Sequence, residues 1–163
     1  MSILFIPDKS ILASRLQTLI CPVNCEGLMG SGLALEFSKR YKGLLYHYRK
    51  ACERGAINIT DGFPSFWVHR TSGWKQQILC LPVERSYSDK PELETIFRGI
   101  DLLVQTYRQH DITSLAIPML GTESGSYTWD DIGYDVVCRL SALDIPMALY
   151  GEEPFDKKKN IRR

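Results

Sequence analysis

The chain has 163 residues, of which 44% are hydrophobic and 24% are charged, and its net charge is +1 at neutral pH. This length and composition suit one globular domain with a full core. The small net charge creates no overall field for nucleic acid or an anionic membrane, and no apolar run approaches the roughly 20 residues that span a bilayer. The N-terminus lacks a signal-peptide pattern, so we expect a cytoplasmic protein without a membrane partner.

Short apolar segments alternate with amphipathic ones along the first half of the chain, which is typical of an α/β domain. In chain order, this half predicts a strand at residues 2–6, a helical turn at 11–16, a buried strand at 19–23, and helices at 33–41 and 44–54. Gly43 separates the two helices, because glycine is a poor helix former.

The second half continues the alternation. In chain order, it predicts strands at 57–60, 65–70 and 77–81, a helix at 93–110, a strand at 114–119, a helix from 128 to about 143, and a last strand at 146–150. Thr128 and Asp131 have the spacing of a capping box, with Asp in place of the usual Glu. The whole pattern predicts a three-layer α/β/α fold around a mixed central sheet.

Two glycine-rich loops each follow an apolar strand and lead into a helix. The first reads Asn24-Cys-Glu-Gly-Leu-Met-Gly-Ser-Gly32, and the second reads Gly121-Thr-Glu-Ser-Gly-Ser126. Glycine lets the backbone approach a ligand closely, and each helix start offers unpaired N–H groups. Because ligands of such sheets bind at the carboxyl ends of the strands, the loops predict a diphosphate-containing ligand between them. The alternative is a pair of plain turns, with Asn24 only capping the first.

The five cysteines are odd in number and scattered, which predicts reduced thiols rather than a disulfide framework. No Cys/His spacing indicates a metal site, and no cofactor is expected. Residues 156–163 form a basic C-terminal tail. We expect this tail to be solvated, and the alternative is a weak contact with nucleic-acid phosphates.

The segment from Pro22 to Phe37 resembles the first ligand loop of macrodomains, through the pattern Asn-Cys-x-Gly-x-Met-Gly-x-Gly-x-Ala. It is most similar to the branch that holds DNA and protein ADP-ribosyl glycohydrolases and ADP-ribose 1″-phosphate phosphatase-like proteins. The segment 117–121 and Trp129 resemble the second loop of that branch. The likeness runs through nearly the whole chain, so we expect a macrodomain at residues 1–155.

The resemblance implies ADP-ribose, or a molecule that carries it, as the ligand of a monomeric protein. Nucleic acid is then expected only as a modified substrate. The resemblance places the distal ribose at Asn24, and it places Tyr150 either at the adenine or in the core. The implied ligand-binding residues are Ser10, Ile11, Asn24, Gly30, Ser31, Gly32, Leu33, Leu120, Gly121, Thr122, Glu123, Ser124, Gly125, Ser126 and Tyr150.

Three positions depart from the family pattern. Ser10 stands where the family has an acidic residue for the adenine amine, and Asp8 could replace that acid after a local shift. Glu123 ends a Gly-Thr-Glu segment where the branch has Gly-Cys-Gly. Glu84 replaces the lysine that the glycohydrolase branch carries after its third main strand.

The change at Glu84 alters the available chemistry. A lysine amine can form a Schiff base with the opened ribose, and a carboxylate cannot. Glu84 could instead deprotonate water or trap an oxocarbenium ion, with Glu123 as the second carboxylate of a pair. The candidate catalytic residues are therefore Asn24, Glu84 and Glu123.

Several functions stay open at this point. The reaction is either release of ADP-ribose from a modified macromolecule or removal of phosphate from ADP-ribose 1″-phosphate. A second class of function is binding of ADP-ribose without chemistry, with Glu84 as a surface residue. A more distant possibility is a small nucleotide-binding protein with an unrelated ligand.

Overall fold

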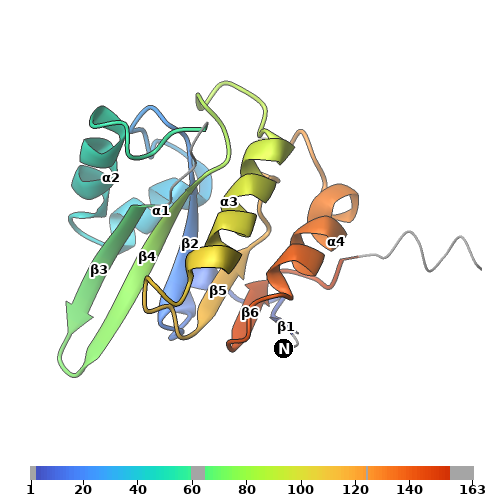
Figure 1. Cartoon of the computed structure of the whole chain (residues 1–163). Helices are drawn as coiled ribbons and strands as arrows, with labels where there is room; N and C mark the ends of the chain where they lie inside the picture. The colour runs from blue at the N-terminus through green and yellow to red at the C-terminus, as the bar shows by residue number, and fades with distance from the viewer. Residues whose placement is uncertain (1–2, 60–64, 124, 155–163) are drawn as a thin grey trace, which may run out of the picture.

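The computed structural model describes residues 3–59, 65–123 and 125–154. A six-stranded sheet in the order β1-β6-β5-β2-β4-β3 forms its middle layer (Figure 1). All neighbouring strands are parallel except β3 and β4, which form an antiparallel hairpin. The strands are β1 (Ile3–Phe5), β2 (Thr18–Val23), β3 (Ser65–Thr71), β4 (Trp74–Pro82), β5 (Leu115–Pro118) and β6 (Met147–Tyr150).

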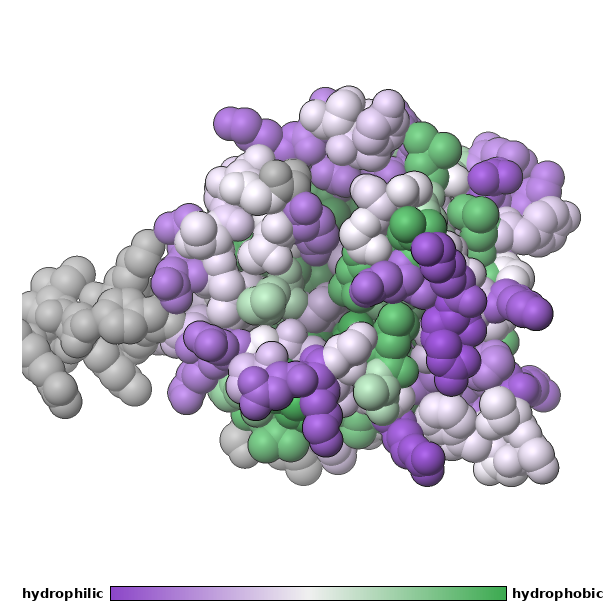
Figure 2. All heavy atoms as spheres, turned by 180° about the vertical axis from the view of Figure 1, so that it is seen from behind, coloured by the Kyte–Doolittle hydropathy of each residue, from purple (hydrophilic) through white to green (hydrophobic). Residues whose placement is uncertain are grey.

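Helices cover both faces of this sheet (Figure 1). A short 3-10 helix, η1 (Ile11–Ala13), packs on one face with α1 (Gly32–Arg40) and α2 (Leu44–Glu53). The opposite face carries α3 (Leu93–Thr106) and α4 (Trp129–Leu140). Figure 2 shows the face of α1 and α2, where hydrophobic side chains reach the surface in a band among polar ones. The predicted three-layer fold with a mixed sheet is thus confirmed.

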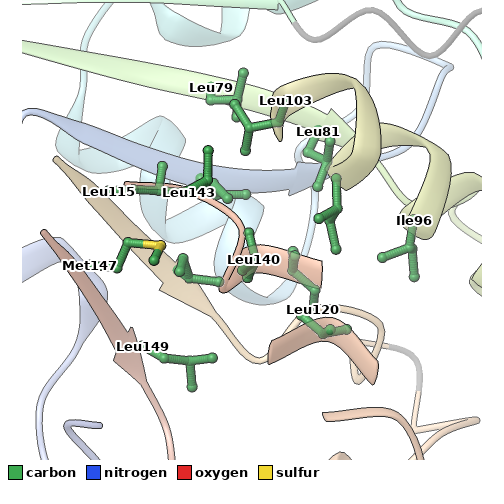
Figure 3. Packing of buried hydrophobic residues seen from close by; sticks show 14 of the residues in the cluster. Leu79, Leu81, Ile96, Leu103, Leu115, Leu120, Leu140, Leu143, Met147 and Leu149 are labelled. Carbon is green, nitrogen blue, oxygen red and sulfur yellow. The ribbon is translucent and has the colours of Figure 1, made fainter. Parts of the chain in front are cut away.

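Each face of the sheet has its own hydrophobic cluster, because successive side chains of a strand point to opposite faces. In β4, Leu79 and Leu81 belong to the cluster under α3 and α4, whereas Ile78 and Cys80 belong to the cluster under α1 and α2. Figure 3 shows the first of these clusters, which also contains Leu120 from the second glycine-rich loop. This buried leucine fixes the loop to the core.

The capping box at the start of α4 is confirmed. The N–H of Asp131 donates to Thr128 Oγ1 (3.3 Å), and the N–H of Thr128 donates to Asp131 Oδ2 (3.1 Å). The shorter Asp side chain therefore replaces Glu in this role. The Trp129 indole N–H donates to the backbone oxygen of Glu152 (2.9 Å) and so ties α4 to the segment after β6.

The observed elements differ clearly from the predicted ones in five places. The helical turn expected at 11–16 spans only Ile11–Ala13, and the strand expected at 77–81 begins at Trp74. Residues 57–59 form no strand; Ile57 is buried against α2 instead, and an apolar run alone cannot distinguish these two environments. The helix expected to reach residue 110 ends at Thr106, and turns follow it. The helix expected to reach about residue 143 ends at Leu140. Thr60 and the basic tail lie outside the described residues.

All five cysteines are free, and Cys138 is exposed on α4 although it lies in an apolar run. In the described part of the chain, no helix has the length and hydrophobicity that crossing a membrane requires.

Candidate functional site

Two adjoining cavities open at the carboxyl ends of the parallel strands, where the glycine-rich loops lie. The first has a volume of about 430 Å³ and the second about 400 Å³, and both are lined by Gly32, Leu33 and Glu123. Volumes of this size are typical of small-molecule sites. Because the cavities share three residues, together they form one extended site that suits a long ligand.

The first loop supplies most of one wall of the first cavity. Its lining residues from the predicted set are Asn24, Gly30, Ser31, Gly32 and Leu33. A Cβ atom added at Gly30 or Gly32 would meet no other atom within 4 Å, so both glycines face open space. Gly32 has a φ of +58°, a conformation that favours glycine. The sequence prediction for this loop therefore matches the position of the cavity.

Asn24 is buried and its side chain holds the loop together. Its Nδ2 donates to the backbone oxygen of Leu28 (2.9 Å), and its Oδ1 accepts from the N–H of Glu26 (2.9 Å). The Tyr48 hydroxyl donates to Oδ1 (2.6 Å) and lies 2.7 Å from the backbone oxygen of Asn24. The turn-capping interpretation of Asn24 is thus correct, and the residue also lines the first cavity.

We expect Tyr48→Phe to destabilise the protein and weaken ligand binding together. The change removes the hydroxyl donor from Asn24 Oδ1, which keeps the N–H of Glu26, and the loss of this one buried hydrogen bond costs about 1 kcal/mol of unfolding free energy. Urea denaturation and calorimetry with ADP-ribose measure the two effects. Tyr46→Phe on the exposed face of α2 is the control, and it should change neither. Equal stability of Tyr48→Phe and the wild type would contradict this role.

Main-chain hydrogen bonds join the segment after β4 to the first loop. The N–H of Val83 donates to the oxygen of Val23 (2.9 Å), and the N–H of Cys25 donates to the oxygen of Arg85 (3.0 Å). These two bonds flank residue 84. They place Glu84 in the lining of the first cavity, together with Asn24.

Glu84 is half-buried in the wall of the first cavity. Its Oε2 is buried and has no hydrogen-bond partner among the described residues. Burial raises the pKa of Glu84, and repulsion by Asp89 and Glu26 raises it further. The carboxylate therefore has an unused acceptor, and its pKa is shifted toward neutrality.

The second loop places Glu123 where the two cavities meet. Its carboxylate accepts a hydrogen bond from the N–H of Gly121 (3.4 Å). Glu123 is exposed to the cavity space, yet the protein atoms near its carboxylate desolvate it in part, and this raises its pKa to about 7. Repulsion by Glu84 also raises this pKa, so the two carboxylates interact across the first cavity.

The other residues of the second loop are placed unequally. Thr122 lines the second cavity. Of the described loop residues, Gly121, Gly125 and Ser126 line neither cavity, and Ser124 lies outside the described part. Leu120 was expected to bind ligand, but its side chain is fully buried in the core. The sequence could not show this, because a leucine in a loop has no periodic pattern that reveals its direction.

The second cavity is lined by Ser10, Ile11 and Tyr150, as the predicted set requires. The Ser10 hydroxyl accepts from the N–H of Leu12 (3.2 Å) and caps η1, so that acceptor is already engaged. The expected substitute acid Asp8 lines neither cavity, whereas Glu36 of α1 lines the second. Sequence reasoning missed Glu36, although it lies one helical turn after Gly32 and hence on the same side of α1.

Two exposed hydrophobic residues that the predicted set omits also line the first cavity. Leu28 is 43% exposed and Tyr87 is 65% exposed. Both lie near Asn24 and Glu84 in the cavity wall. Within the described residues, no group of His, Cys, Asp and Glu side chains has the arrangement of a metal site.

The Macro domain family matches residues 20–133 of this chain. The chain belongs to this family. The macrodomain is 31% identical over 141 residues to a protein of Mycobacterium tuberculosis named DNA ADP-ribosyl glycohydrolase. This alignment covers 86% of this chain and 40% of the relative. It is also 28% identical over 165 residues to a DNA ADP-ribosyl transferase–DNA ADP-ribosyl glycohydrolase fusion protein of Thermosipho africanus, covering 93% of this chain and 42% of the relative. The chain therefore spans about two fifths of the length of these relatives.

Solved structures support the same assignment. The macrodomain of Mycobacterium tuberculosis DarG superposes with a TM-score of 0.82 at 27% identity, covering 93% of this macrodomain and all of that chain. Thermosipho africanus DarTG in complex with ADP-ribose superposes with a TM-score of 0.79 at 27% identity, covering 92% of this macrodomain and 42% of that chain. The resemblance inferred from the two loops is confirmed, and so is the macrodomain fold.

Proposed function

We propose that this macrodomain binds ADP-ribose and hydrolyses the bond that joins it to a modified macromolecule. The observation that carries the proposal is the extended site, in which two adjoining cavities meet at Gly32 and Glu123 and the first also holds the half-buried Glu84. A solved relative in complex with ADP-ribose supports this ligand.

The three parts of the ligand lie in different parts of the site. The diphosphate lies over Gly30 and Gly32, where the backbone faces open space. The distal ribose enters the first cavity, with Asn24 in its wall. The adenosine enters the second cavity beside Tyr150, whose ring is partly buried against the core and also lines the site.

We propose nucleic acid as the macromolecule that carries the ADP-ribose. Relatives named DNA ADP-ribosyl glycohydrolase support this choice. The exposed Leu28 and Tyr87 at the first cavity offer an apolar and aromatic surface for a base. A free 1″-phosphate fits less well, because it would meet the negative charge of Glu84, Glu26 and Asp89.

In the reaction, the Glu84 carboxylate accepts a proton from water while the water oxygen bonds to C1″ of the distal ribose. The bond between C1″ and the macromolecule breaks, and the proton passes to the departing group. The free acceptor at Oε2 and the raised pKa of Glu84 suit a general base. No imine is formed, because a carboxylate cannot make one.

Calorimetry with ADP-ribose, ADP and AMP tests the binding part of the proposal. ADP-ribose should bind at least about tenfold more tightly than ADP, a difference of about 1.4 kcal/mol, because only ADP-ribose fills the first cavity. AMP should bind more weakly still. Equal affinity for ADP-ribose and ADP would contradict the placement of the distal ribose.

Release of ADP-ribose from a modified DNA oligonucleotide, with modified protein and ADP-ribose 1″-phosphate as comparison substrates, tests the reaction. We expect turnover on the oligonucleotide. Tight binding of ADP-ribose without turnover on any of the three substrates would instead identify a binding module.

A further inference from the structure

The carboxylate of Glu123 lies where a bound phosphate would compete with it. Building on the proposed function, we propose that Glu123 is an affinity-determining residue: its carboxylate occupies an N–H group of the second glycine-rich loop in place of a phosphate oxygen, and the diphosphate binds after this carboxylate is protonated. The branch that this chain resembles has glycine at this position, so this feature distinguishes the present sequence from that branch.

A hydrogen bond within the loop supports this role. The N–H of Gly121 donates to Glu123 Oε1 (3.4 Å). Backbone N–H groups in a glycine-rich loop are the donors that bind an anion. In this protein a side chain of the same loop already accepts from one of these donors.

The position of Glu123 makes the competition direct. Glu123 lines both cavities, and Gly32 lines both as well. A ligand that fills both cavities therefore lies against both residues. Its diphosphate would approach a carboxylate that holds one of the same donors and carries the same sign of charge.

The charged and titratable groups around Glu123 come from four other segments. Glu84 after β4 repels it, and Glu123 in turn helps to raise the pKa of the Cys21 thiol in β2, after burial and Cys80. Lys9 before η1 and Glu36 of α1 line the second cavity with it. None of the ion pairs between described residues includes Glu123. Protonation is therefore a direct way to neutralise this carboxylate.

The sign of the pH dependence follows from these charges. Burial raises the pKa of Glu123 to about 7 in the free protein, and a neighbouring diphosphate would raise it further. Above pH 7 the free protein must then take up a proton when the ligand binds. Affinity should fall as the pH rises above about 7, by up to about tenfold per pH unit.

Calorimetry with ADP-ribose between pH 6.5 and 8.5, in buffers of different ionisation enthalpy, tests the proposal. The affinity of the wild type for ADP-ribose should fall with rising pH as described, and the wild type should take up a proton on binding at pH 8. Glu123→Gln should bind at pH 8.5 at least as tightly as the wild type does at pH 6.5, without proton uptake. The matched control Glu94→Gln, on α3 outside the site, should behave like the wild type. A wild type without pH dependence, or weaker binding by Glu123→Gln, would overturn the proposal.

Two readouts separate this proposal from the proposed function. In the ligand-free protein, the NMR signal of the Gly121 N–H should titrate near pH 7 in the wild type and stay constant in Glu123→Gln. Inorganic diphosphate should bind more tightly to Glu123→Gln than to the wild type at pH 8. If both results hold without any binding of ADP-ribose, the role of Glu123 stands and the proposed function fails. If the Gly121 N–H signal of the wild type does not change with pH, Glu123 does not have the proposed role, whether or not ADP-ribose binds.

Discussion

Gly30→Glu should abolish detectable ADP-ribose binding in a protein that remains folded. A Cβ atom at Gly30 meets no other atom within 4 Å, and Gly30 does not adopt a left-handed backbone conformation, so a side chain fits there without strain. The new carboxylate would enter the first cavity beside the expected diphosphate. Two unit charges about 5 Å apart repel by about 3 kcal/mol at an effective dielectric constant of about 20. This corresponds to a loss of at least about 100-fold in affinity.

Gly30→Gln is the matched control, because it adds the same volume without the charge. Calorimetry should show a smaller loss for Gly30→Gln than for Gly30→Glu, while thermal unfolding should be nearly equal for both. Gly32→Glu is a less clean test, since its φ of +58° would add backbone strain. Unchanged affinity in a folded Gly30→Glu protein would place the ligand elsewhere.

Glu84→Gln should lower turnover by about 10²–10⁴-fold, the usual contribution of a general base, while ADP-ribose binds nearly as before. The amide keeps the size of the carboxylate but cannot accept a proton from water. In the wild type, the rate should fall as the pH drops through the raised pKa of Glu84, because the protonated form is inactive as a base. Single-turnover assays on the modified oligonucleotide measure this loss.

Two comparisons make the Glu84 result specific. Glu123→Gln should change mainly the pH dependence of binding, so a loss of turnover at full binding in that variant would move the base to Glu123. Borohydride reduction during turnover should trap no adduct in the wild type. A trapped adduct would show lysine chemistry and would point to Lys90, in the same segment as Glu84.

Local patterns predicted the parts of the fold that depend on local chemistry. The capping box at Thr128 was predicted because its partner is three residues away, and the strand 19–23 was predicted because it is uniformly apolar. The buried coil at Ile57 and the early end of α3 at Thr106 depend on what packs against them. Such contacts are not encoded in the spacing of apolar residues along one segment.

The candidate site divides in the same way. The glycine pattern predicted residues that line the first cavity, and the resemblance added residues that line the second. The burial of Leu120 and the position of Glu36 in the second cavity depend on how a loop and a helix dock onto the sheet. The hydrogen bond from Gly121 to Glu123 depends on the folded shape of one loop, which a residue list does not specify.

The main-chain bonds on either side of residue 84 have a consequence for how this scaffold can diversify. The bonds from Val83 to Val23 and from Cys25 to Arg85 use no side-chain atoms, so they fix the Cα atom of residue 84 whatever its side chain. A substitution at residue 84 can therefore change the side chain that lines the first cavity while these two main-chain bonds remain. At this position a single substitution can exchange one kind of chemistry for another while the backbone of the cavity wall is kept.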